Sequence, residues 1–418
     1  MRSWNKWAQA GVIFSLFLLF RLLVTRERVP DQTSDLQTLF RQPRVQRQRN
    51  PDASLSRPFL DKINNYWLVT GSTQIRNLGT LRLTSRGQPG QHGAIVSNGA
   101  GDNVLDDFET VVWFSISGKK GQGVRGKRDM GDGIVFMITP EKQFVSLDLR
   151  SSYAKQQYEH NSGGILYSDR ELMGLPRNLP GLAVVVDTYR NDPKTKINAP
   201  FANVLLNLDP QRHHYDAASD GKESTGFSLA GPLKLKNSLL SGTDVKLRII
   251  SLESIGFLKI DISYSDHDNW IELYQKDKNL FLPKNQKTGE RYIAIGALTG
   301  ELTETVEIKQ VETSEFHWDA QNDDEFDLAE EMQFFLAHEY GEFIHIKKDE
   351  LNDWESAKAQ GKTNLDLHSN KPSSSSTISL LKWSCIIITL YGLSLTLRIA
   401  LKRIHILRAK KRPRNILG

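Results

Sequence analysis

An apolar run that stops at a cluster of oxygen-rich side chains raises the first question of chemistry. Residues 182–192 read LAVVVDTYRND, so a strand-like stretch is followed at once by such residues: Asp187, Thr188, Tyr189, Asn191 and Asp192. Side chains of this kind often bond their own backbone in a turn. Calcium, in turn, prefers six to eight oxygen ligands from carboxylates, carbonyls and water. The stretch by itself leaves both interpretations open.

The elements that must position this stretch are short strands. Between residues 57 and 318 apolar and polar residues alternate with period two, and Gly, Asn, Asp and Pro separate the runs. Such a pattern with hardly any helical window predicts a two-sheet antiparallel β-sandwich. The strands are expected at 80–84, 108–117, 133–139, 182–188, 201–208, 246–253, 257–265, 291–298 and 304–312.

Two apolar segments predict the topology of the chain. Residues 1–25 combine basic residues with an apolar run, which is typical of a signal peptide or, without a small-residue cleavage site, of an uncleaved anchor. Residues 378–400 are apolar over about twenty positions, enough to cross a bilayer core. The basic tail 401–418 indicates the cytosolic side. We expect a single-pass type I membrane protein with a luminal domain.

Composition divides the remainder and excludes some functions. Residues 26–56 are rich in Arg, Gln and Pro and predict a disordered arm, while 319–371 predict an acidic helical stalk between the domain 57–318 and the membrane. The net charge of +5 hides this segregation, and no folded stretch concentrates cations, so no nucleic-acid partner is expected. The single Cys385 excludes an intrachain disulfide. Protein partners could bind the acidic stalk or the basic tail.

An enzymatic interpretation rests on one acidic run. EFDLAEE at 325–331 would place Glu325, Asp327 and Glu331 on one strand face, and two flanking carboxylates are what glycoside hydrolysis requires. The run lies beyond the predicted sandwich, however, in sequence that favours a helix with a solvated acidic face. We therefore expect the protein not to be an enzyme.

Several motifs resemble one family in the order in which they occur. RPF at 57–59, LRLT at 81–84, GDG at 131–133, GLAVVVDTYRND at 181–192, YDAASDG at 215–221 and TGEL at 299–302 are similar to the L-type (leguminous-type) lectin-like domain of cargo receptors of the early secretory pathway. The resemblance implies an all-β, concanavalin-like jelly-roll sandwich. Within the family the chain looks most like small fungal members at the endoplasmic reticulum and nuclear envelope, and cycling to the Golgi stays open.

The resemblance also implies a site and a ligand. Calcium would be bound by the carboxylates of Asp187 and Asp220, the backbone carbonyl of Tyr189 and the side-chain oxygen of Asn191. A sugar would contact Asn191, Asp132 and the specificity loop Gly300, Glu301 and Leu302. The implied ligand is mannose on high-mannose N-glycans of glycoproteins, which the receptor sorts or retains.

Two departures from the family pattern keep a second function open. Ala217 stands where mannose-binding members carry histidine, and the family's GDL loop reads Gly300-Glu301-Leu302, with a longer acidic side chain. Both weaken the expectation of sugar binding. The alternative is a lectin-like fold that no longer binds sugar and acts as a protein-interaction module at the membrane.

Overall fold

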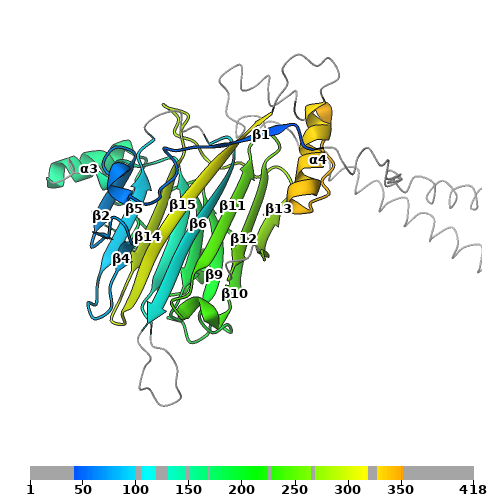
Figure 1. Ribbon diagram of the computed structural model, residues 1–418. Helices are drawn as coiled ribbons and strands as arrows, with labels where there is room; N and C mark the ends of the chain where they lie inside the picture. Colours follow the sequence, from blue (N-terminus) through cyan, green and yellow to red (C-terminus); the bar gives the residue numbers. More distant parts are fainter. Residues whose placement is uncertain are drawn as a thin grey trace, which may run out of the picture.

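Two antiparallel sheets lie face to face in the computed structural model (Figure 1), which describes residues 42–99, 105–118, 130–146, 151–167, 169–224, 227–264, 269–318, 327–349 and 351. One sheet has eight strands: β13 (Ile271–Lys276), β12 (Phe257–Ser263), β11 (Val245–Leu252), β6 (Asp107–Gly118), β15 (Glu304–Trp318), β4 (Leu81–Thr84) and β3 (Gln74–Ile75) in spatial order, with β1 (Val45–Arg49) also paired to β15.

The second sheet has seven strands. In spatial order they are β10 (Ser228–Lys234), β9 (Phe201–Asn207), β8 (Gly181–Asp187), β7 (Gly133–Thr139), β14 (Tyr292–Leu298), β5 (His92–Ser97) and β2 (Trp67–Gly71). Two helices, α3 (Ser152–Asn161) and α4 (Leu328–Tyr340), accompany the sheets, together with short 3-10 turns at Phe59–Asp61, Gln143–Val145, Lys222–Ser224 and Asn237–Leu240. The predicted all-β sandwich is confirmed, and each of the nine expected strands is present.

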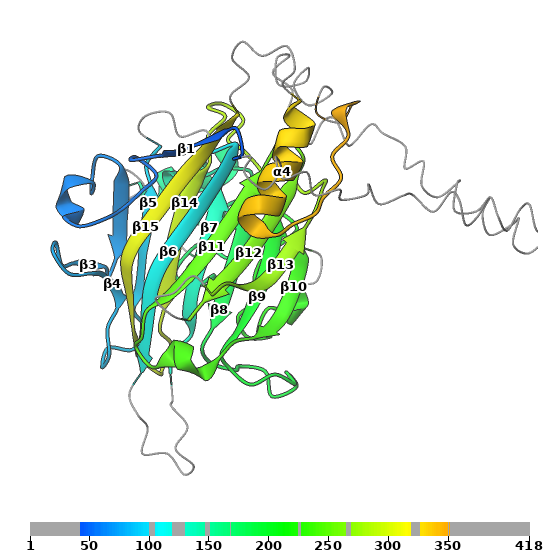
Figure 2. The same cartoon turned by 45° about the vertical axis from the view of Figure 1, so that its right-hand side comes forward.

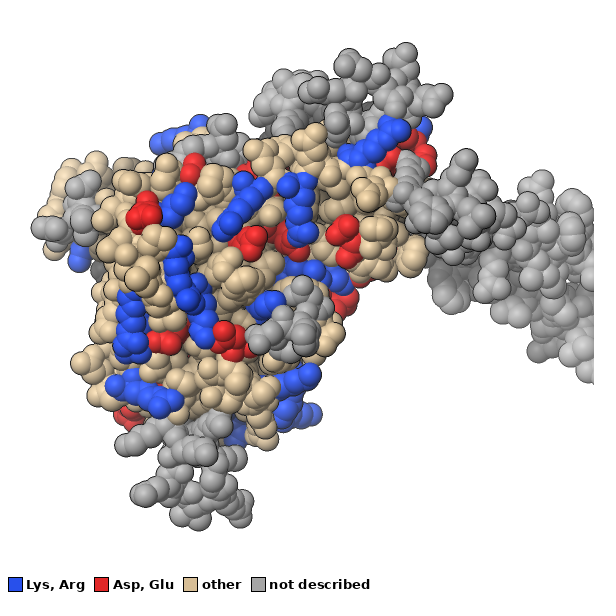
Figure 3. All heavy atoms as spheres, viewed as in Figure 1, with Lys and Arg blue, Asp and Glu red and all other residues tan. Residues whose placement is uncertain are grey.

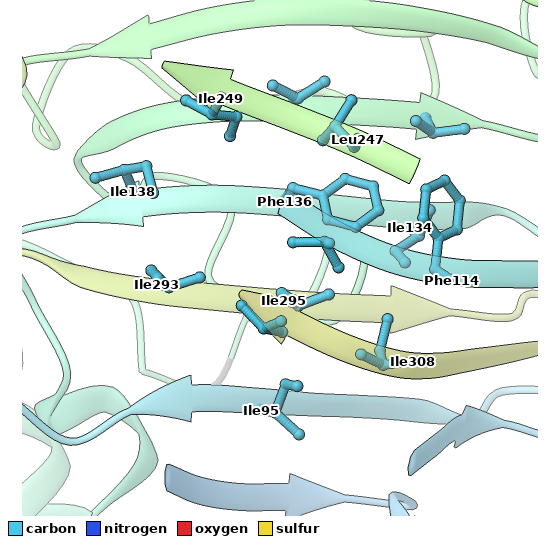
Figure 4. Packing of buried hydrophobic residues seen from close by; sticks show 14 of the residues in the cluster. Ile95, Phe114, Ile134, Phe136, Ile138, Leu247, Ile249, Ile293, Ile295 and Ile308 are labelled. Atoms are coloured by element: carbon cyan, nitrogen blue, oxygen red, sulfur yellow. The ribbon is translucent and has the colours of Figure 1, made fainter. Parts of the chain in front are cut away.

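Alternation of side chains builds the core between the sheets. Phe114 of β6 meets Phe136 of β7 with ring centroids 4.9 Å apart, and branched aliphatic residues from both sheets surround them (Figure 4). These inward side chains are fully buried and supply most of the hydrophobic stabilisation.

The outer face of the seven-stranded sheet is buried as well. Val135, Met137, Ala183 and Val185 point away from the central core and pack under loops and under Tyr158 of α3. Because both faces of β7 and β8 are covered, every residue of these two strands is buried. This explains why 182–186 is apolar without interruption instead of alternating.

Helix α4 covers part of the outer face of the eight-stranded sheet (Figure 2). Asp327 accepts a hydrogen bond from the N–H of Ala329 at its start, and Gly341 with φ 73° ends it. Met332, Phe335 and Leu336 pack on the outward apolar side chains of β11, β12 and β15. The prediction of a solvated acidic stalk is therefore wrong for residues 327–340, because an apolar stripe binds this helix to the sheet.

The predicted disordered arm also needs correction. Residues 45–49 form strand β1, which pairs with 314–318 of β15, and Ala53 and Leu55 are fully buried. The domain thus begins before residue 57, since the polar sequence VQRQR is held by backbone pairing instead of by apolar burial. The segments 1–25, 378–400 and 401–418 lie outside the described residues. Within the described ones, neither helix has the length and apolar character needed to cross a membrane.

Candidate calcium and sugar site

The predicted site residues meet where β7 begins and β8 ends. Gly133 pairs with Asp187 in the antiparallel register, so Asp132 and the loop after Asp187 emerge side by side. The N–H of Thr188 donates to the carbonyl oxygen of Asp132 over 3.0 Å. Gly133 has φ 140°, and a side chain there would collide with the carbonyl oxygen of Val186. The close approach of these two chain segments therefore requires glycine.

Asp220 is drawn into the same loop from a separate part of the chain. Its carboxylate accepts the N–H of Asn191 at 2.7 Å, the N–H of Asp192 at 3.1 Å and the hydroxyl of Thr195 at 2.6 Å. The residue itself sits in the left-handed region with φ 54°. The structure thus brings Asp220 next to Asn191, as the family resemblance implies.

Asp187 is buried, and only one of its two carboxylate oxygens accepts a hydrogen bond from the described residues. Oδ1 accepts the N–H of Tyr189 at 2.9 Å, whereas Oδ2 is buried and has no hydrogen-bond partner. Burial raises the pKa of Asp187 well above its ordinary value, and the charges of Asp220, Asp132 and Glu304 raise it further, while the Tyr189 N–H acts in the opposite direction. A carboxylate in this position needs a positive partner to stay ionised.

Glu304 is a member of this group that the sequence reasoning missed. It is fully buried at the start of β15, where the Thr188 hydroxyl donates to its Oε2 over 2.8 Å and its Oε1 has no partner. Burial raises the pKa of Glu304 well above its ordinary value, and Asp132 raises it further. In the sequence, Glu304 is one of several alternating acids of a strand, and nothing there marks it as buried.

Tyr215 lies close to these carboxylates. Its hydroxyl is buried without a partner, and burial, followed by the charges of Asp187 and Asp220, raises the pKa of Tyr215 well above its ordinary value. We call the four carboxylates of Asp132, Asp187, Asp220 and Glu304 the acidic end. Within the described residues none of the four forms a salt bridge with a side chain of the protein.

The donors of the acidic end fit calcium. They are hard oxygens, and the buried, unpartnered Oδ2 of Asp187 is the kind of atom that a cation would satisfy. The described part of the chain contains no cluster of three or more His, Cys, Asp or Glu side chains grouped as a metal site. The predicted calcium set, however, has only two carboxylates, Asp187 and Asp220, and relies on the Asn191 amide and the Tyr189 carbonyl for the rest.

The predicted sugar contacts lie against the same end. A Cβ atom on Gly300 would stand 3.0 Å and 3.1 Å from the carboxylate oxygens of Asp132, and one on Gly131 would stand 2.7 Å from the carbonyl oxygen of Leu302. The loop from Gly300 to Leu302 can therefore pack closely on the turn before β7 only because both positions are glycine. Glu301 and Asn191 are exposed beside it. The structure places all predicted sugar-contact residues around one end of the sandwich.

The position of the missing histidine is close to this end. Ala217 lies three residues before Asp220, and its carbonyl oxygen accepts the N–H of Asp220 at 3.2 Å. The methyl group packs against the apolar layer outside the seven-stranded sheet. His213 does not take the place of histidine at 217, because its ring packs on Phe227 with centroids 5.3 Å apart.

The sequence profile of the Legume-like lectin family matches residues 46–323, so the chain belongs to this family. Members of this class are carbohydrate-binding proteins.

Particular relatives follow from the comparisons. Protein UIP5 of Saccharomyces cerevisiae is 47% identical over 365 residues, which cover 85% of this chain and 81% of that protein. The exoplasmic/lumenal domain of VIP36 in its Ca²⁺/Man3GlcNAc-bound form is 23% identical with a TM-score of 0.46, over 63% of this chain and 89% of that one. The metal-free carbohydrate recognition domain of Emp46p is 17% identical with a TM-score of 0.41, over 63% and 97%. At such identities the two solved structures share only the fold.

Proposed function

We propose that this protein is a calcium-dependent lectin that binds high-mannose N-glycans of glycoproteins and sorts or retains them in the early secretory pathway. The calcium ligands are Asp187, Asp220, the Tyr189 carbonyl and Asn191. The sugar contacts are Asn191, Asp132 and the loop Gly300–Leu302. The observation that carries the proposal is the acidic end, where the buried carboxylates of Asp187, Asp220 and Glu304 lie beside the predicted sugar loops and no cation of the described residues pairs with them.

Each protein group has a definable task in this scheme. Calcium, when bound, supplies the positive charge that the acidic end lacks. Asp220 holds the backbone at Asn191 through two N–H bonds, and so keeps the exposed Asn191 side chain where its amide can donate to a sugar hydroxyl. Asp132 borders the Gly300 loop and can accept from neighbouring hydroxyl groups. Binding without a covalent step is all that this arrangement requires.

The cellular setting is part of the proposal. We infer a type I membrane protein of the endoplasmic reticulum or nuclear envelope, with possible cycling to the Golgi, whose lectin domain is luminal. Support comes from family membership and from the apolar and basic segments of the sequence.

The test separates metal binding from sugar binding. Titration calorimetry of the full chain with CaCl₂ should show binding that Asp187→Asn abolishes and that Asp132→Asn leaves in place. On a glycan array both variants should lose the high-mannose signal, and a chelator should remove it from the wild type. Asp192→Asn is the matched control, because Asp192 is a neighbouring carboxylate that Lys222 already neutralises over 2.6 Å. Absence of calcium binding in the wild type would refute the proposal.

Ala217 favours a second candidate function. The family's histidine is missing there, so the chain could bind calcium for stability and use the fold as a protein-interaction module. A chain that binds calcium but no glycan on the array would support this second candidate over the first.

A further inference from the structure

The outer face of the eight-stranded sheet has two halves of different chemistry. Ile250, Leu252 and Phe316 point outward in the half that α4 covers. Further along the strands the outward positions change character. Val111 of β6 lies between Arg248 of β11 and Glu312 of β15, and Trp113 lies between Lys246 and Gln310. Neither described helix covers this second half, where Lys and Arg side chains gather over the sheet (Figure 3).

Two adjoining cavities lie on the uncovered half. One of about 480 Å³ and one of about 580 Å³ share Trp113 and Lys246 in their walls. We call this surface the cationic face, after the cationic side chains that line the two cavities: Arg47, Arg49, Arg57, Lys246, Arg248 and Lys309. Three carboxylates, those of Glu109, Asp244 and Glu312, also line them. Cations therefore outnumber acids two to one.

Two of the three acids of the cationic face pair with cations, and the third, Glu312, accepts a hydrogen bond from the Gln310 amide. Glu109 is nearly buried and pairs with both Arg47 and Arg248, and Asp244 pairs with Lys309. Arg49 and Arg57 are the remaining positive charges, since neither forms an ion pair within the described residues. The surface therefore offers positive charge for which the described residues supply no counter-charge.

We propose that the cationic face binds an acidic segment of a partner polypeptide, an interaction separate from sugar binding. The size fits such a ligand. Lys309 and Ser314 are five residues apart on β15, about 17 Å at strand spacing, and Arg49 pairs with Ser314 at the far end. An extended segment of about five or six residues, with Asp or Glu at several positions, spans this distance.

The aromatic side chains favour carboxylates over nucleic acid. Single-stranded nucleic acid binds to basic grooves by stacking its bases on free aromatic faces. Here Arg248 lies 4.2 Å from the ring centroid of Trp270, and Lys246 lies 5.3 Å from that of Trp113. Each ring already has a cation over it. The rings thus hold point charges in place for small anionic groups and are poor platforms for bases.

The test is a binding experiment with the full chain and a defined probe. The probe is a fluorescein-labelled peptide of eight residues in which Glu alternates with Ser, measured by anisotropy at low salt. Its Gln/Ser counterpart should not bind. We expect Arg49→Glu/Arg57→Glu to weaken binding by about tenfold or more and added salt to weaken it in the wild type. Lys234→Glu/Lys276→Glu is the matched control, with the same change in charge at exposed positions outside both cavities, and should change affinity less than about twofold.

Any one of three results would overturn the proposal. The wild type fails to bind the acidic peptide, or the two double variants lose peptide affinity equally. In the third, the wild type binds oligothymidine or phosphatidylserine vesicles more tightly than the peptide. Unfolding curves of both variants check that the fold is intact. Because Arg49 and Arg57 lie outside the acidic end, their variants should retain calcium and glycan binding, so failure here is distinguishable from failure of the lectin proposal.

Discussion

The two ends of the sandwich both bury carboxylates, but only at one end do cations of the described residues pair with any of them. Strand β6 joins them: its first residue, Asp107, lies at one end, and its last, Gly118, pairs with Glu304 at the acidic end. At the first end Arg291 and Lys284 contact Glu253 over 3.0 Å and 2.7 Å, and Lys284 also pairs with Asp106. We call this group the paired cluster.

The difference indicates what each group is for. The Arg291 guanidinium is almost fully buried and also donates to the carbonyl oxygens of Leu105 and Leu282, so the paired cluster ties three chain segments together. Its carboxylates are paired without a ligand, although the buried Nε of Arg291 has no acceptor among the described residues. At the acidic end, one carboxylate oxygen of Asp187 and one of Glu304 are buried without a partner among the described residues, and burial raises the pKa of both groups. Keeping them ionised is costly without a cation. One sandwich thus contains carboxylates that its own cations pair with and carboxylates that have no cation among the described residues.

The largest expected effect comes from removing a buried cation, Arg291, from the paired cluster. Arg291→Met leaves Glu253 buried without its guanidinium and removes two hydrogen bonds to backbone carbonyls. We expect the free energy of unfolding to fall by about 3–5 kcal/mol in urea denaturation. Lys284→Met, at a side chain that is partly exposed, should cost clearly less. Equal, small losses below about 1 kcal/mol would mean that the pairing contributes little and that the comparison of the two ends fails.

The second prediction concerns the pH dependence of stability at the end of the sandwich that holds the paired cluster. Burial raises the pKa of Asp107 to about 6 from an ordinary 3.8, although the indole N–H of Trp318 lowers it. The folded state therefore holds this proton more tightly than the unfolded chain. The stability from this group is complete below pH 3.8 and is lost as the pH rises through about 6.

Asp107→Asn should remove this slope. Between pH 4 and 7 the wild-type free energy of unfolding should fall by roughly 2.4 kcal/mol from this group, and the variant should lack this change. The measurement is urea denaturation across pH with saturating calcium, so that the acidic end is neutralised. Identical pH profiles of variant and wild type would refute the assignment to Asp107.

In the third prediction, loss of a charged side chain raises the free energy of unfolding, whereas in the first it lowers it. Asp187→Asn removes a buried charge that has no partner, so without calcium the variant should be more stable than the wild type by about 1–2 kcal/mol at pH 8. Calcium at 100 times its dissociation constant should stabilise the wild type by about 2.7 kcal/mol and the variant not at all. Asp192→Asn should behave as the wild type does. A destabilised variant without calcium would refute the assignment of an unpartnered, costly charge to Asp187, because asparagine retains an oxygen that can accept the Tyr189 N–H.

Much of the fold follows from the sequence, because period-two alternation and turn residues are local signals. The nine expected strands carry this pattern, whereas the other six described strands, β1, β2, β3, β5, β10 and β13, were not among those expected. Of these, β1 is entirely polar between its ends and β3 has only two residues. The burial of α4 was missed because its acids dominate the composition, although its apolar stripe at Leu328, Met332 and Phe335 was visible. The loops of the site were found through motif resemblance. Glu304 and Tyr215 join it only through tertiary contacts, which no local pattern reports.

The smallest expected effect comes from adding a donor beside the acidic end. Ala217→His puts an imidazole at the position where mannose-binding members of the family carry one, three residues from Asp220. One additional hydrogen bond of about 1 kcal/mol corresponds to a five- to tenfold gain in affinity for mannose. Ala218→His, one residue away and exposed, is the control and should leave mannose affinity unchanged. Calcium affinity, measured by calorimetry, should stay the same in both, because neither change removes a ligand. If Ala217→His leaves mannose affinity at the wild-type value, the absence of histidine is not what limits sugar binding, and the neutralisation of the acidic end alone decides whether the loops bind a glycan.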